Sequence, residues 1–201
     1  MKKLIALIGL LASGNLYAYG NGYTSAPMIS KQRLISTELT GITSTGGGVG
    51  VQARYTQKVN SDLTFDAGIG MGGGELNNRI FVGADYLLFP DYQKQPRVSI
   101  KATFNNAKEF KDRRNIVGIA PNLSKGFNFW GHEAFPYLAV PVNLNLNTGK
   151  KTYQTSVAAQ IGMIGKVPFQ GLEHLTMAFE GTIKVKDHHS GIALSFGYPL
   201  D

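Results

Sequence analysis

Residues 47–104 read GGVGVQARYTQKVNSDLTFDAGIGMGGGELNNRIFVGADYLLFPDYQKQPRVSIKATF, and apolar and polar side chains alternate along most of this stretch. The alternation runs through four segments, 49–56, 63–72, 79–88 and 98–105. A period of two residues is typical of a β-strand with one apolar and one polar face. The stretch therefore predicts four consecutive β-strands.

The same alternation continues on both sides of these four segments. Further strands are predicted over residues 33–43, 116–124, 137–146, 152–163, 175–185 and 192–198. Residues 106–115 are charged and polar, which predicts an exposed loop, and residues 125–135 predict an aromatic-rich connection. A tilted strand of ~9–11 residues spans a bilayer, and most of the predicted strands are near this length. The predicted fold is all-β: a transmembrane antiparallel up-and-down β-barrel of about ten strands, with eight strands as the alternative.

Residues 1–18 predict a signal peptide. Lys2 and Lys3 precede the apolar run Leu4–Ala12, and polar and small residues follow as far as Ala18. This order is typical of a secretory signal. The predicted organisation is therefore a signal peptide over residues 1–18 and a single β-barrel domain over residues 19–201. The chain has no cysteine, so disulfides cannot hold an exported domain together here.

The chain carries a moderate positive charge. Its formal net charge is +7, from 20 basic and 13 acidic residues. Removing Lys2 and Lys3 with the signal peptide leaves 18 basic residues against 13 acidic ones, or +5. So small an excess does not indicate a nucleic-acid partner. On an exported protein it favours outer-membrane lipids and lipopolysaccharide as partners.

Two features favour lipid against the apolar face of the strands. Charged residues occupy mid-strand positions on the opposite face, together with glycines that suit a crowded lumen. Aromatic residues such as Tyr55, Phe65, Tyr86 and Phe127 collect at alternate strand ends, as in the aromatic girdle of membrane barrels. A soluble periplasmic lipocalin-like ligand-binding barrel is the alternative, because its strands also alternate, with the apolar face inward.

The polar face predicts a network of charges inside the barrel. Its predicted members are Glu38, Arg54, Asp66, Arg79, Asp85, Lys101, Glu180 and Lys184.

The expected turns give this network a register. A turn centred on Asn60 would set Arg54 opposite Asp66. The next two turns would set Asp66 beside Asp85, and Asp85 beside Lys101. The predicted row places two acids between two bases, and it would plug a narrow lumen.

The last predicted strand ends in a pattern of its own. Phe196-Gly197-Tyr198 resembles the aromatic-x-aromatic ending by which outer-membrane barrels are recognised for assembly, although Ala193 stands where that pattern has glycine. With the signal peptide and the strand pattern, the chain resembles the broad class of small Gram-negative outer-membrane β-barrel proteins. The resemblance implies an outer-membrane location, the barrel assembly machinery as a partner, and Phe196 and Tyr198 as the assembly signal.

One cluster near the predicted outer rim is a candidate for catalysis. It holds Asp187, His188, Ser190 and Asp112. Omptin proteases and lipid A deacylases use acidic, histidine or serine residues on small barrels, but this sequence has no motif of either group. The expected function is therefore a structural barrel or a narrow pore for small solutes, not an enzyme. An outer-membrane hydrolase with a site near Asp187 and His188 is the alternative, and no cofactor or metal is expected.

Overall fold

The computed structural model of the chain describes residues 27–28, 32–44, 47–73, 76–109, 112–129, 131–147 and 149–200. The predicted signal peptide, residues 1–18, lies outside these ranges. The regular elements of the described residues are all β-strands, so the predicted all-β class is confirmed. Within the described ranges no helix is long and apolar enough to cross a membrane.

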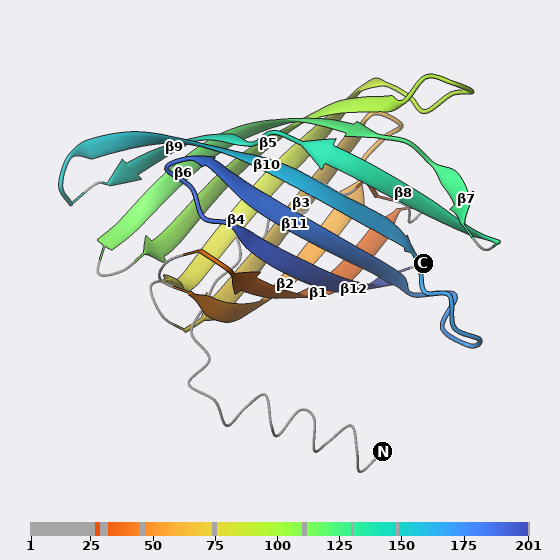
Figure 1. The fold of residues 1–201 in the computed structure, drawn as a ribbon, viewed down its shortest axis with the longest axis horizontal. Helices are drawn as coiled ribbons and strands as arrows, with labels where there is room; N and C mark the ends of the chain where they lie inside the picture. The colour runs from red at the N-terminus through yellow and green to blue at the C-terminus, as the bar shows by residue number, and fades with distance from the viewer. Residues whose placement is uncertain are drawn as a thin grey trace, which may run out of the picture.

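Twelve strands follow one another along the described chain (Figure 1). They are β1 (Arg33–Ile42), β2 (Gly48–Lys58), β3 (Leu63–Gly72), β4 (Leu76–Phe89), β5 (Arg97–Glu109), β6 (Asp112–Ser124), β7 (Phe127–Phe129), β8 (His132–Ala139), β9 (Val142–Asn147), β10 (Thr152–Lys166), β11 (Thr176–Lys186) and β12 (Gly191–Leu200). All of their pairings are antiparallel.

The sheet closes on itself through its first and last strands. β1 pairs with β12 from Arg33↔Leu200 to Ile42↔Gly191, and it pairs with β2 on its other side. β8 and β9 lie end to end between β6 and β10, because both of them pair with both of these neighbours. The short β7 pairs with β8. The barrel therefore has ten strand positions, as predicted, and not eight.

The two mouths of the barrel are called here the first rim and the second rim. The first rim holds the start of β1 at Arg33 and the end of β12 at Leu200. The second rim holds the end of β1 at Ile42 and the start of β12 at Gly191.

Two prolines mark the place where β8 gives way to β9. Pro141 lies between these two strands, and Pro121 lies in the adjoining β6. Proline has no N–H to donate to a ladder, but its carbonyl can accept. The Val140 N–H donates to the Pro121 carbonyl at 3.1 Å, and the Ala158 N–H donates to the Pro141 carbonyl at 3.1 Å. The break between β8 and β9 is therefore a local loss of hydrogen bonds. The register with β6 is the same in β8 as in β9.

Large apolar side chains cover the outside of the barrel. Their exposed fractions on the strands run from 36 % for Leu146 to 77 % for Tyr153. This apolar belt includes Ile35, Leu39, Val51, Ile69, Ile80, Val82, Ile100, Val117, Ile119, Leu138, Ile161, Phe179, Ile183 and Ile192. Near the first rim it carries the exposed aromatic side chains Tyr55, Phe65, Tyr86, Phe196 and Tyr198.

The inside of the barrel is close-packed, and glycines make room for large inward side chains. A Cβ on Gly68 would lie 2.4 Å from the ring of Phe81, and one on Gly162 would lie 2.4 Å from the ring of Tyr137. Real Cβ atoms do not approach other atoms this closely, so both rings depend on the missing side chain opposite them.

Two segments expected to lack strands contain them. The predicted loop 106–115 is wrong, because β5 and β6 both extend into it. Asn106 and Asn115 face each other across this hairpin, where Asn106 Nδ2 donates to Asn115 Oδ1 at 2.7 Å. A cross-strand pair of this kind makes polar residues compatible with a strand, so their polarity did not signal a loop. The predicted connection 125–135 likewise contains β7 and the start of β8.

Candidate functional site

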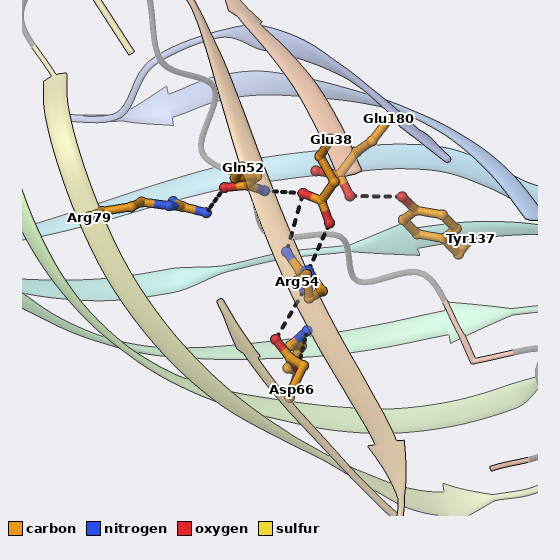
Figure 2. Close-up of polar contacts among 8 residues, drawn as sticks. Glu38, Gln52, Arg54, Asp66, Arg79, Tyr137 and Glu180 are labelled. Carbon is orange, nitrogen blue, oxygen red and sulfur yellow. Dashed lines mark hydrogen bonds and ion pairs between the residues drawn. The ribbon is translucent and has the colours of Figure 1, made fainter. Parts of the chain in front are cut away.

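The candidate site is a buried network of charged side chains inside the barrel. Glu38, Arg54, Asp66 and Lys101 come from β1, β2, β3 and β5, and their exposed fractions are only 0–6 %. Alternation along each strand turns these positions inward, opposite the apolar belt. Figure 2 shows Glu38, Arg54 and Asp66 pointing toward one another.

Arg54 bridges two acids. Its Nε lies 2.7 Å from Glu38 Oε1, and one terminal nitrogen lies 3.1 Å from Asp66 Oδ2. The planar guanidinium presents donors in several directions, so one side chain can serve carboxylates on both neighbouring strands. A lysine at this position would offer a single charged nitrogen and could not hold the same geometry.

Asp66 forms ion pairs with two bases. Besides Arg54, its Oδ1 lies 2.8 Å from Lys101 Nζ. Lys101 is on β5, and β4 runs between β3 and β5. The residue of β4 that pairs with Asp66 is Gly83, whose missing side chain leaves the space in which the two charges meet.

A second branch of the network runs from Glu38 through Gln52 to Arg79. Gln52 Nε2 donates to Glu38, and Arg79 donates to Gln52 Oε1 at 2.6 Å (Figure 2). Phe81 contacts two cations, with its ring centre 4.9 Å from the Arg54 guanidinium and 4.7 Å from that of Arg79. The ring interacts favourably with both charges.

Glu180 is held by neutral donors. The Tyr137 hydroxyl donates to Glu180 Oε2 at 2.7 Å, and Gln160 Nε2 donates to Oε1 at 2.9 Å. Each of the three side chains is at most 3 % exposed. A buried carboxylate needs such donors, because burying a charge without compensating hydrogen bonds is costly.

Two predicted members, Asp85 and Lys184, take no part in the contacts described above. Asp85 is half-buried near the first rim and forms its ion pair with Arg97, at 2.5 Å. Lys184 is exposed near the second rim, where β11 no longer pairs with β12. The prediction that Lys184 extends the interior network is therefore wrong.

The predicted register between β2 and β3 is wrong by two residues, although the contact between Arg54 and Asp66 is present. Arg54 pairs with Gly68, so it reaches Asp66 diagonally. The predicted placement of Asp66 beside Asp85 is also wrong, because Asp66 pairs with Gly83. The pairing of Asp85 with Lys101 is confirmed. This register avoids opposing two carboxylates directly, which would be destabilising.

The sequence did not identify four partners in these contacts, namely Gln52, Arg97, Tyr137 and Gln160. Alternation alone places Gln52, Tyr137 and Gln160 on the inward face. What alternation cannot give is the partner across the lumen, because that depends on the register and on side chains from distant strands.

The charged side chains of the network are buried inside the barrel. Three buried acids, Glu38, Asp66 and Glu180, accompany three buried bases, Arg54, Arg79 and Lys101. None of these six side chains is more than 6 % exposed, so solvent hardly reaches them. Chemically the arrangement can fill and rigidify the barrel without leaving net charge inside it.

The turn between β11 and β12 holds three of the four residues of the predicted catalytic cluster. His188 Nδ1 lies 2.9 Å from the neighbouring His189 carbonyl, and the Lys184 N–H donates to Ser190 Oγ at 2.9 Å. Burial lowers the pKa of His188, partly offset by the contact with that carbonyl. Asp112, the fourth predicted member, begins β6, which is not a neighbour of β11 or β12. These contacts stabilise a turn and do not align a serine with a histidine.

Among the described residues, no group of three or more acidic, histidine or cysteine side chains could hold a metal ion. No protein-family model and no curated protein matches the chain.

Proposed function

We propose that this protein is an integral outer-membrane β-barrel of a Gram-negative bacterium, with a structural role and a closed lumen. The proposal rests on the contrast between the two faces of the barrel wall: the outer face is the apolar belt, and the inner face carries buried charges. Side chains such as Ile69 and Ile183 are 58 % and 59 % exposed on the outside, while Glu38 and Arg54 are 0 % and 4 % exposed inside. Lipid is the solvent that this distribution fits.

The extent of the belt strengthens the argument. Soluble monomers seldom expose contiguous apolar patches beyond a few hundred Å². Here exposed aliphatic and aromatic side chains occur on nearly every strand. A soluble lipocalin-like barrel would place its apolar side chains inward, so the reversed pattern weighs against that alternative.

The filled interior favours a structural role over a pore. An open pore needs a polar path wide enough for a hydrated solute along the whole barrel. The charge network instead occupies the cross-section with side chains that exclude solvent. A hydrolase near Asp187 and His188 is less favoured, because the contacts seen there belong to a turn.

Partners follow from the same proposal. The belt would contact outer-membrane lipids and, with the basic excess of the chain, lipopolysaccharide. Phe196 and Tyr198 lie on β12, the strand that closes the barrel against β1. Both side chains face outward and are 45 % and 55 % exposed, so the barrel assembly machinery could read them before closure.

The test is the behaviour of the protein in isolated membranes. We expect it in the outer-membrane fraction, migrating on gels as a compact form before boiling and as an extended form afterwards. In planar bilayers we expect no steady single-channel current. Recovery in the soluble fraction without detergent would contradict the membrane proposal, and a steady ohmic conductance would contradict the closed lumen.

A further inference from the structure

A patch of apolar side chains lies inside the barrel near the first rim. Leu34, Ile164 and Ala178 point inward from β1, β10 and β11, and they are 4–7 % exposed. An apolar side chain facing a polar lumen is unfavourable unless another apolar group covers it. Some apolar group should therefore cover this patch.

Pro27 and Met28 supply that cover. They precede β1 in the sequence, and they line the same cavity as Leu34, Ile164 and Ala178. Inward residues of eight strands, β1 to β5 and β10 to β12, bound this cavity, so Pro27 and Met28 lie within the barrel. Pro27 is buried and Met28 is half-buried.

The cavity also connects this pair of residues to the charge network. Arg54, Asp66 and Lys101 form part of its lining, together with Asp85. Its volume is about 50 Å³, which exceeds the ~10–15 Å³ that a cavity needs to hold a water molecule. Within the described chain, Asp85 Oδ1 is buried without a hydrogen-bond partner from the protein, and a water in this cavity would satisfy it.

We infer that Pro27–Met28 form an internal plug, which seals the lumen between the first rim and the charge network. Pro27 and Met28 share the cavity with the apolar side chains of Leu34, Ile164 and Ala178, and this apolar surrounding favours the plug in its place. The plug keeps bulk water from the ion pairs of Arg54 and Asp66. Because Pro27 and Met28 belong to no strand, the plug can leave without unpairing the barrel. The inference concerns the interior alone and does not depend on where the barrel resides.

The test uses the absence of native cysteines, so that a single introduced thiol reports one site. Ser195→Cys places that thiol in the cavity lining. In the barrel folded in detergent, the additional change Pro27→Gly/Met28→Gly removes both apolar side chains of the plug. We expect a small uncharged maleimide then to react with residue 195 at least about tenfold faster, because a site that must first open reacts only while it is open.

A matched control tests whether the effect is local. Ser156→Cys lies on β10 toward the second rim and is 2 % exposed, so its slow reaction should not change when the plug residues are replaced. An unchanged rate at residue 195, in a variant that retains the gel mobility of a closed barrel, would overturn the inference. An equal acceleration at residue 156 would overturn it too, since it would indicate general loosening.

A second variant probes the plug in the otherwise unchanged chain. Met28→Cys should react at least about tenfold more slowly than Asn60→Cys, which lies in an exposed turn, and denaturant should abolish the difference. Equal rates in the folded barrel would mean that Met28 is not docked, and the plug would be excluded.

Discussion

Lys101 Nζ lies 2.8 Å from Asp66 Oδ1, although the two residues belong to strands that do not pair with each other. Gly83, on the strand between them, makes this possible. A Cβ on Gly83 would lie 2.8 Å from Asp66 Oδ1 and 3.0 Å from Lys101 Cε. The glycine is thus part of the charge network without carrying a charge.

Gly83→Ala should lower the free energy of unfolding by about 1–3 kcal/mol, because the new methyl group must displace the Asp66 carboxylate or the Lys101 chain. The control is Gly181→Ala on β11, where the nearest atoms to a Cβ are 3.8–3.9 Å away and belong to Ile161. Gly181→Ala should alter the free energy of unfolding by no more than about 0.5 kcal/mol. Urea unfolding in detergent measures both, and equal costs would show that the space at Gly83 is not needed.

Arg54→Ala and Asp66→Ala should each lower the free energy of unfolding by about 3–5 kcal/mol, since each leaves a buried charge without its partner. The double variant should depart from additivity by about 0.5–3 kcal/mol, as expected of residues in contact. A second cycle pairs Asp66→Ala with Lys184→Ala, whose side chain is exposed, and it should be additive. Additivity in the first cycle would mean that the Arg54–Asp66 contact contributes no coupling.

Ile69→Arg should destabilise the barrel in lipid vesicles by about 2–4 kcal/mol, because it places a charge on the outward face near the middle of β3. Val59→Arg is the matched control. Val59 is 55 % exposed, close to the 58 % of Ile69, but it lies in the turn after β2. That change should cost about 0–1 kcal/mol, as at a membrane interface. Comparable stability of both variants in vesicles would exclude lipid contact at Ile69.

The loop between β4 and β5 should lose its contacts with Lys125 and Gly126 when the solution becomes acidic. Asp91 contacts Lys125 Nζ and accepts a hydrogen bond from the Gly126 N–H at 2.6 Å. Burial raises the pKa of Asp91, but the Lys125 contact and the Gly126 hydrogen bond outweigh it and lower the pKa below its usual value of 3.8. A carboxyl whose pKa is lower in the folded state than in the unfolded state stabilises the folded state. This contribution is fully present when the pH is above the unfolded-state pKa, and it is lost as the pH falls through the folded-state pKa.

The amide chemical shift of Gly126 should therefore titrate with a midpoint below pH 3.8. Asp91→Asn should abolish that transition and leave the remaining amide shifts of the barrel unchanged. A midpoint at or above the usual aspartate value would show that Lys125 does not hold the carboxylate.

The sequence was sufficient for ten strand positions and for the direction of their faces, because burial on one side imposes a period of two. It missed the strand residues within 106–115 and 125–135 and the division of one predicted strand into β8 and β9. It was insufficient for the register. The turn after β2 is set by Asn60, whose Oδ1 accepts hydrogen bonds from the N–H groups of Asp62 and Leu63 at 2.9 and 2.8 Å. Several local arrangements of this kind fit the same turn sequence, and each shifts the following strand by whole residues.

The same limit applies to the interior. Alternation along β2 turns both Gln52 and Arg54 inward, but partners across the lumen depend on every register between the strands that carry them. The contact between Tyr137 and Glu180 joins residues 43 positions apart in the chain. No local pattern encodes such a pair, whereas the glycine opposite each large ring is a sequence signal that could have been used.

Pro121 and Pro141 have a mechanical consequence. Each accepts a hydrogen bond through its carbonyl but cannot return one, so the rungs at Val140 and Ala158 carry one hydrogen bond where a regular antiparallel rung carries two. These half-bonded rungs lie on opposite sides of the same strand position. The wall is therefore held by fewer hydrogen bonds along this line, and bending here, which would flatten the circular cross-section into an oval, breaks fewer of them than bending at a regular rung.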